Sequence, residues 1–185
     1  DNTLISLIAA DHRLMPHLHL SVQAGNNVIL KRMKRRHNRQ DVIDLCNSLR
    51  HARPGIVFGA DVIVGFPTED DNMFQETLQL VDEAGLTYLH VFPYSPREGT
   101  PAARMPQVPN CIRKERSQKL RKKAFDVKSQ YFDQLIGSYA SVLSENKGRG
   151  YTEHYAPVQF KQNMRSGDIH KVKITGRNDY VLTVE

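Results

Sequence analysis

Polar side chains recur near the ends of three segments whose apolar patterns are typical of β-strands. The segments are His17–Val22, Ile56–Val64 and Thr87–Phe92. Ser21 and Gln23 stand at the end of the first segment, and Asp61 lies in the second. His90 lies in the third. Ligands of parallel sheets bind at the carboxyl ends of the strands, so we predict that these residues share one ligand site. Gly65 follows the second segment, and its lack of a Cβ would let a flat ligand approach the backbone closely.

Each of these residues also has a structural interpretation. The polar residues after the first strand could satisfy hydrogen bonds of a turn, Asp61 could be a buried structural carboxylate, and His90 could belong to the core. Another hypothesis is ordinary acid–base chemistry, in which His90, Asp61 or Glu69 donates or accepts a proton. Because polar residues recur at three strand ends, we prefer a shared binding site.

Helices are expected between the strands. The order strand, helix, strand, helix, strand, helix predicts a parallel α/β sheet with right-handed connections. Asn38 is expected to cap one helix, and Cys46 falls on its apolar face, so Cys46 is predicted to be a core thiol. Thr68 is expected to cap the next helix, and Gly85 to end it. A long amphipathic helix is predicted from about Asn110.

The β-like segments predict two parts. Three parallel strands cannot close a barrel, so we expect residues 1–136 to be the second half of a larger domain that begins before Asp1. Residues 137–185 contain short β-like runs separated by turns, which predicts a small all-β barrel. These runs are Tyr139–Leu143, Tyr151–His154, Val158–Phe160, His170–Thr175 and Tyr180–Val184.

The composition favours a cytoplasmic protein with an anionic partner. The 185 residues carry a net charge of +6, and half of the 26 basic residues lie in two clusters. The clusters span Lys31–Arg39 and Arg113–Lys123. Such clusters bind nucleic-acid phosphates, although either could be a solvated helix face. No apolar run approaches the ~18 residues of a transmembrane helix, and no signal peptide opens the chain. The two cysteines are too few for a disulfide framework or a structural zinc site.

Three blocks of sequence resemble the radical-SAM tRNA methylthiotransferases. The blocks are His19–Gly25 with Leu30–His37, Asp61–Glu69, and His90–Thr100 with Pro101–Ala103. The lead-in Leu14–His19 and Ala24 are most similar to the threonylcarbamoyladenosine branch of that family. The resemblance covers essentially the whole chain. It implies an α/β fold in which residues 1–136 are the C-terminal half of a TIM-like radical-SAM barrel and residues 137–185 are a TRAM-like, RNA-binding β-barrel.

The resemblance also implies a reaction. Enzymes of this family methylthiolate C2 of an adenosine next to the anticodon, here N6-threonylcarbamoyladenosine, with S-adenosylmethionine and two 4Fe–4S clusters. Cys46 and Cys111 match the spacing of neither set of cluster cysteines, and clusters require thiolate ligands. We therefore expect no catalytic residue, metal ligand or cluster in this chain, and no activity without a missing N-terminal half of the same polypeptide.

By position, the resemblance assigns eight residues to S-adenosylmethionine. They are Ser21, Gln23, Arg35, Val62, Ile63, Val64, Gly65 and Phe92. Arg35 would pair with the methionine carboxylate, and the backbone of residues 62–65 would border the adenine with Phe92. One position departs from the family, because Thr68 stands where its members usually carry glycine. The backbone conformation at Thr68 is therefore left open.

Transfer RNA is the expected partner. The residues assigned to RNA are Lys147, Arg149, Tyr151, Lys171, Lys173 and Arg177. The basic residues would contact phosphates, while Tyr151 and Tyr155 could stack on bases or pack into the small barrel. An alternative is a stand-alone RNA-binding module without radical chemistry, which would bind RNA but not S-adenosylmethionine. An ordinary acid–base enzyme ranks last, since it requires activity without iron or S-adenosylmethionine.

Overall fold

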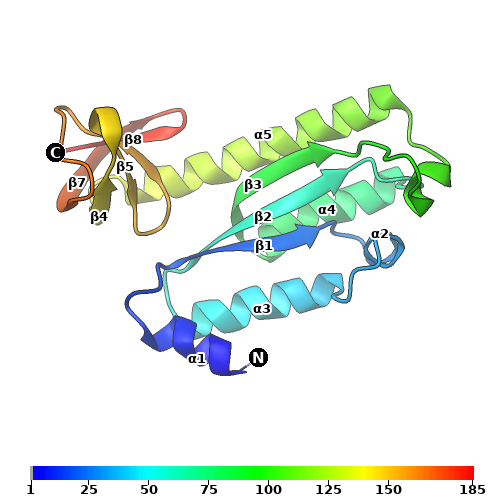
Figure 1. The fold of residues 1–185 in the computed structure, drawn as a ribbon, viewed down its shortest axis with the longest axis horizontal. Coiled ribbons are helices and arrows are strands. Elements are labelled where there is room, and N and C mark those ends of the chain that lie inside the picture. Colours follow the sequence, from blue (N-terminus) through cyan, green and yellow to red (C-terminus); the bar gives the residue numbers. More distant parts are fainter. Residues whose placement is uncertain (1) are drawn as a thin grey trace.

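The computed structural model describes residues 2–185, without the side chains of residues 2 and 147, and consists of an α/β part followed by a β-barrel (Figure 1). The α/β part contains α1 (Asn2–Ala10), β1 (His17–Gln23), α2 (Asn27–Arg32), α3 (Arg39–Ala52), β2 (Val57–Val64), α4 (Asp71–Glu83), β3 (Leu86–Pro93), a 3-10 turn (Pro101–Arg104) and α5 (Asn110–Leu135). The barrel contains β4 (Tyr139–Ser144), a 3-10 turn (Asn146–Gly148), β5 (Arg149–Thr152), β6 (Pro157–Gln159), β7 (Ile169–Asn178) and β8 (Val181–Val184).

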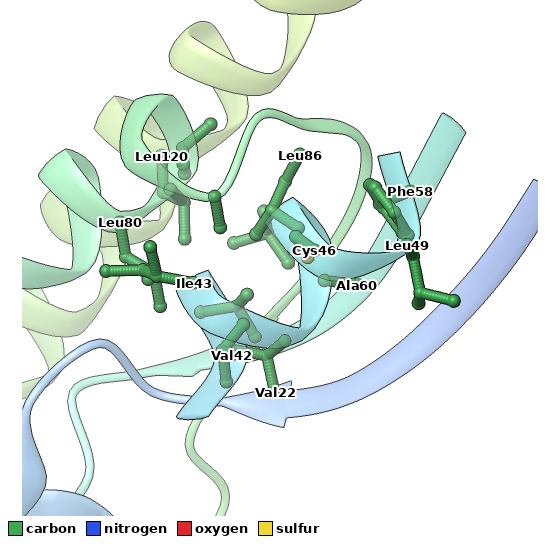
Figure 2. Packing of buried hydrophobic residues seen from close by; sticks show 14 of the residues in the cluster. Val22, Val42, Ile43, Cys46, Leu49, Phe58, Ala60, Leu80, Leu86 and Leu120 are labelled. Carbon is green, nitrogen blue, oxygen red and sulfur yellow. The ribbon is translucent and has the colours of Figure 1, made fainter. Parts of the chain in front are cut away.

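The three strands of the α/β part form a parallel sheet in the order β1-β2-β3. Alternate residues of a strand point to opposite faces, and one face of this sheet is apolar. On that face, Phe58, Ala60, Val62 and Val64 of β2 are at most 2% exposed. Figure 2 shows how side chains of α3 pack on this face together with Leu80 of α4 and Leu120 of α5. The sheet is therefore covered by helices on one side, and the predicted parallel α/β arrangement is confirmed.

The other face of the sheet is open around its middle. It carries polar and aromatic residues of all three strands, which are exposed or half-buried: His19, Ser21, Asp61, His90 and Phe92. The β-barrel lies toward the amino ends of the strands (Figure 1), where its Tyr155 stacks on His17 of this face. Val57 and Tyr88 belong to the same buried cluster as the barrel residues and Phe132 of α5. The barrel therefore shares a core with the amino end of the sheet.

The barrel is closed, with the strand order β4-β5-β6-β8-β7. Neighbouring strands are antiparallel except for β6 and β8, which are parallel. The predicted small β-barrel is confirmed, but the bounds of the strands predicted at Tyr151–His154 and His170–Thr175 are wrong. β7 continues to Asn178 because it pairs first with β4 and then with β8, so residues 176–178 are strand rather than turn. β5 already begins at Arg149.

Three of the expected helix ends are confirmed, and one is wrong. Asn38 caps α3 in a reciprocal capping box with Asp41, Gly85 follows α4 with φ +58°, and α5 begins at Asn110. Thr68 does not cap α4, because its φ of +70° is far from the extended conformation that an N-cap requires. Asp70 is the cap instead, and its side chain accepts a 2.8 Å hydrogen bond from the Met73 amide. Within residues 2–185, no helix has the length and apolar character needed to span a membrane.

Candidate functional site

Two histidines and one carboxylate converge at the centre of the open face. His90 lies opposite Asp61 in the β2–β3 register, and His19 lies opposite Gly59 in the β1–β2 register. Asp61 Oδ1 lies 2.8 Å from His19 Nε2 and 3.2 Å from His90 Nδ1. A Cβ at Gly59 would lie 2.5 Å from His19 Nδ1, so glycine provides the room for the ring. We call His19, Asp61 and His90 the central triad.

The central triad has the composition of a site for proton transfer or for a divalent cation. Two imidazoles and one carboxylate suit both uses, and the ligand atoms of the three residues lie within 4.8 Å of one another. Their side chains are 34%, 33% and 60% exposed, so a ligand can reach them from the open face. The sequence had indicated Asp61 and His90. The contribution of His19 was missed, although its spacing from His17 places both rings on one face of β1.

The carboxyl ends of the strands hold most of the residues assigned to S-adenosylmethionine. Ser21 is exposed on the open face, while Ile63 and the 49% exposed Phe92 lie opposite each other in the register. Gln23 is 8% exposed, has φ +73°, and its side-chain amide has no hydrogen-bond partner among the described residues. These four residues lie at one end of the sheet. The side chains of Val62 and Val64 lie in the core on the other face, so only their backbone is available to a ligand.

Arg35 lies beyond α2, at the same end of the sheet. Figure 1 shows α2 directly after the end of β1, and the Arg35 amide donates to Leu30 O at 2.9 Å. Its side chain is exposed and has no ion-pair partner within the described chain. The guanidinium is therefore free to bind a carboxylate.

A buried ionic network shapes the turn after β2. The Gly65 amide donates to Glu69 Oε2 at 2.7 Å, and Arg116 Nη1 donates to the same oxygen at 2.9 Å. Burial raises the pKa of Glu69, while the Gly65 amide and Arg116 act in the opposite direction. The side chain of Arg113 fills the space that a Cβ at Gly65 would occupy. On the side where a Cβ would stand, it is therefore Arg113 that approaches Gly65 closely, and not a ligand. Glu69 stabilises the turn through its hydrogen bond with the Gly65 amide.

Aromatic rings form a continuous series at the amino end of the sheet. Tyr155 stacks on Tyr151, with 4.9 Å between ring centroids, and on His17, at 5.0 Å. His17 meets Tyr88 edge-on at 5.4 Å. Burial lowers the pKa of His17, which favours its neutral form in the stack. Tyr151 therefore packs between the barrel and the sheet, and it is not among the residues of the barrel core.

The basic residues assigned to RNA lie on the outer surface of the barrel. Lys171 and Lys173 alternate with buried residues of β7 and are exposed, as is Arg149 on β5. Arg177 is paired with Asp133 of α5 at 2.7 Å, which partly neutralises its charge. The side chain of Lys147 lies outside the described residues. These positions are separated from the carboxyl ends of the strands by the length of the sheet, about 25 Å for strands of this size.

The two cysteines are in different environments. Cys46 is fully buried on α3, and burial raises the pKa of its thiol to about 11, which confirms the predicted core thiol. Cys111 is exposed in the first turn of α5. Because iron–sulfur clusters are held by several thiolates, this pair does not fit a 4Fe–4S cluster, and we derive no step of a mechanism from one.

The chain is similar to radical SAM proteins. The profile of the Radical SAM superfamily matches residues 4–81, the part that holds β1, β2 and the turn with Gly65. Over these residues, the chain has the sequence pattern of the Radical SAM superfamily.

Three curated relatives define the family more closely. The threonylcarbamoyladenosine tRNA methylthiotransferase of Rickettsia prowazekii is 52% identical over 95% of this chain and 42% of its own length. The protein of the same name from Thermotoga maritima is 40% identical over 94% of this chain and 41% of its own length. The tRNA-2-methylthio-N(6)-dimethylallyladenosine synthase of Staphylococcus epidermidis is 37% identical over 97% of this chain and 37% of its own length. The chain is similar to these tRNA methylthiotransferases over nearly its whole length, and it spans about two fifths of the length of these relatives.

The family implies S-adenosylmethionine and 4Fe–4S clusters. The carboxyl end of the sheet fits part of S-adenosylmethionine, because it offers the unpartnered amide of Gln23, the free guanidinium of Arg35 and the exposed ring of Phe92. The two cysteines of this chain, Cys46 and Cys111, do not fit a 4Fe–4S cluster.

Proposed function

We propose that this chain is part of a tRNA methylthiotransferase that modifies C2 of N6-threonylcarbamoyladenosine next to the anticodon, in the cytoplasm. The observation that carries the proposal is the 52% identity over 95% of the chain with a relative named for that activity. The chain spans two fifths of that relative, so we propose that a further, N-terminal part of the same polypeptide holds the clusters. The open sheet is then the C-terminal half of a TIM-like barrel (residues 1–136), and residues 137–185 are a TRAM-like domain.

We propose that the carboxyl end of the sheet holds S-adenosylmethionine, which supplies the radical and methyl chemistry of the family when bound. Ser21 and Gln23 would orient it through hydrogen bonds, and Arg35 would pair with its carboxylate. The backbone of residues 62–65 and the ring of Phe92 would exclude water from the adenine. The free side chains of Gln23 and Arg35 support this assignment.

We propose that the tRNA binds at the other end of the sheet, through the barrel. The exposed Lys171, Lys173 and Arg149 would contact phosphates, and the same role is proposed for Lys147 and Arg177. Phosphate contacts position an RNA without reading its sequence. The open face between the two ends would then face the modified nucleoside.

The test begins with the gene. Sequencing upstream of the Asp1 codon is expected to reveal Cys-x3-Cys-x2-Cys preceded by three further cysteines. The complete gene product, assayed anaerobically with S-adenosylmethionine and tRNA, is expected to yield the 2-methylthio derivative of N6-threonylcarbamoyladenosine by mass spectrometry. Arg35→Met should raise the KM for S-adenosylmethionine about tenfold, while the matched variant Arg36→Met should leave it within about twofold.

Two results would contradict the proposal. An initiator codon directly before Asp1 would leave no cluster ligands and would favour a stand-alone RNA-binding module. That module would bind RNA without affinity for S-adenosylmethionine, which calorimetry on this chain measures directly. If the complete gene product methylthiolates only dimethylallyladenosine, the proposed methylthiotransferase activity stands and the proposed substrate, N6-threonylcarbamoyladenosine, is wrong.

A further inference from the structure

A cavity of about 420 Å³ lies where α5, the edge strand β3 and the barrel meet. Its size is within the range of small-molecule sites, about 300–1,000 Å³. Tyr88 of β3, Lys128 of α5 and Tyr151 of the barrel strand β5 line it. None of the residues assigned above to S-adenosylmethionine borders it. The cavity is therefore a separate feature, built only when the barrel is docked on the sheet.

The charge of the cavity is entirely basic. Arg121 and Lys128 line it together with His90, and no carboxylate does. Arg121 uses one nitrogen to donate to Val91 O at 3.2 Å, which holds its guanidinium at the rim. An anion entering the cavity would therefore meet two fixed cations and no like charge.

Lys128 is a half-buried cation without a counter-ion. Its Nζ lies 5.1 Å from the Phe132 ring centroid, 5.4 Å from that of Tyr180 and 5.8 Å from that of Tyr88. The ammonium has no ion-pair or hydrogen-bond partner among residues 2–185. Rings attract a cation but accept none of its three N–H bonds in the ordinary way. Burial lowers the pKa of Lys128, so the charged form lacks the stabilisation that an anion would supply.

The walls of the cavity are aromatic. Four of the seven tyrosines of the chain line it: Tyr88, Tyr151, Tyr155 and Tyr180. Tyr151 and Tyr155 already stack on each other. The buried hydroxyl of Tyr88 lacks a hydrogen-bond partner in the described chain. Flat π faces beside fixed cations bind unstacked nucleobases and their phosphates.

We infer that this cavity binds one unstacked nucleotide of the RNA, with its base against the tyrosines and its phosphate on Lys128 and Arg121. The inference rests on the proposed function for its RNA partner, but the cavity would also take a free nucleotide. Neither an apolar peptide nor a metal ion matches a cavity with two cations and no carboxylate. The site adds residues of α5 and β3 to the RNA contacts of the barrel.

The experiment uses the 185-residue chain, adenosine monophosphate and a fluorescein-labelled anticodon stem-loop RNA. The chain has no tryptophan, so its intrinsic fluorescence comes from the tyrosines, and a bound base should quench it. Lys128→Met keeps the apolar stem and removes the charge. Lys161→Met is the matched control, because Lys161 is exposed, pairs with Glu185 and lies outside both basic clusters.

Lys128→Met is expected to weaken RNA binding about tenfold and to abolish quenching by adenosine monophosphate. Lys161→Met should change RNA binding by less than about twofold. Circular dichroism checks that each variant is folded. If Lys128→Met does not fold, Tyr151→Leu is the second variant, with the same expected loss of RNA binding and of quenching.

The outcomes separate the two proposals. If the chain binds RNA and both lysine variants weaken binding equally, the cavity is not the site, and the proposed RNA partner stands. If the nucleotide quenches fluorescence in a Lys128-dependent way but the stem-loop RNA does not bind, the cavity is a nucleotide site and the RNA partner is wrong. If neither ligand binds, both proposals are overturned.

Discussion

Thr68 occupies a backbone conformation that a β-branched residue rarely adopts. Its φ is +70°, which is the left-handed region where side chains clash with the backbone. The turn is nevertheless held in place, because Glu69 binds the Gly65 amide and Arg116 binds Glu69. The chain therefore keeps a turn suited to glycine with a threonine at this position.

Relief of this strain should be measurable. Thr68→Gly is expected to raise the free energy of unfolding by about 1 kcal/mol, because glycine adopts positive φ without the cost of ~1–2 kcal/mol that other residues incur. Urea denaturation measures the difference. Thr87→Gly is the control: Thr87 lies in β3 without positive φ, and glycine there should destabilise by about 0.5–1 kcal/mol. A loss of stability in Thr68→Gly would mean that its contacts with Arg32 and Pro67 outweigh the strain.

At the scale of elements, α5 is joined to the sheet by Arg116. This side chain is 5% exposed and binds Glu69 in the turn after β2 and Asp71 at the start of α4. A buried carboxylate without a partner is costly. The contact therefore determines how the first turns of α5 lie against the strand ends.

Arg116→Met is expected to lower the free energy of unfolding by about 3–5 kcal/mol at pH 7. Burial already raises the pKa of Glu69 in the folded chain. As the pH rises, the unfolded chain therefore releases this proton before the folded chain does, and the free energy of unfolding falls until the pH has passed the folded-state pKa. Without Arg116 the pKa rises further, and the loss should shrink at pH 5. Lys119→Met, which removes an exposed pair with Glu115, should cost less than about 1 kcal/mol at either pH. A loss for Arg116→Met that is independent of pH would contradict the role of Glu69.

At the scale of the whole molecule, α5 links two cores. Leu120 is fully buried in the sheet core, and Phe132 is fully buried in the barrel core. The barrel core also includes Val57 and Tyr88 of the sheet. We therefore expect the sheet and the barrel to unfold together, although their secondary structures differ.

Phe132→Ala tests this coupling. It should cost about 3–5 kcal/mol and should shift the unfolding of helices, followed at 222 nm, and of the tyrosine environment, followed in the near ultraviolet, to the same lower urea concentration. Leu143→Ala removes an exposed barrel side chain and should leave both transitions nearly unchanged. Two separate transitions in Phe132→Ala would show that the barrel and the sheet fold independently.

Local features of this protein were predictable from its sequence. The capping box at Asn38, the glycine after α4, the buried Cys46, the parallel α/β order and the small β-barrel all depend on residues a few positions apart or on periodicity along one element. Thr68 was misread for a related reason: a threonine near a helix start suggests a cap, but this one has φ +70° in a turn that the distant Arg116 helps to hold.

Contacts between distant segments were decided only by the tertiary structure. His19 meets Asp61 because of the register between β1 and β2. A shift of this register by one residue would turn the His19 side chain to the other face of the sheet. Tyr155 stacks on His17, and Lys128 lies among three rings, because the barrel docks at the amino end of the sheet. The sequence by itself determined the elements and the chemical types of residue they carry. The tertiary structure decided which of them meet, since packing and register join residues that no local pattern relates.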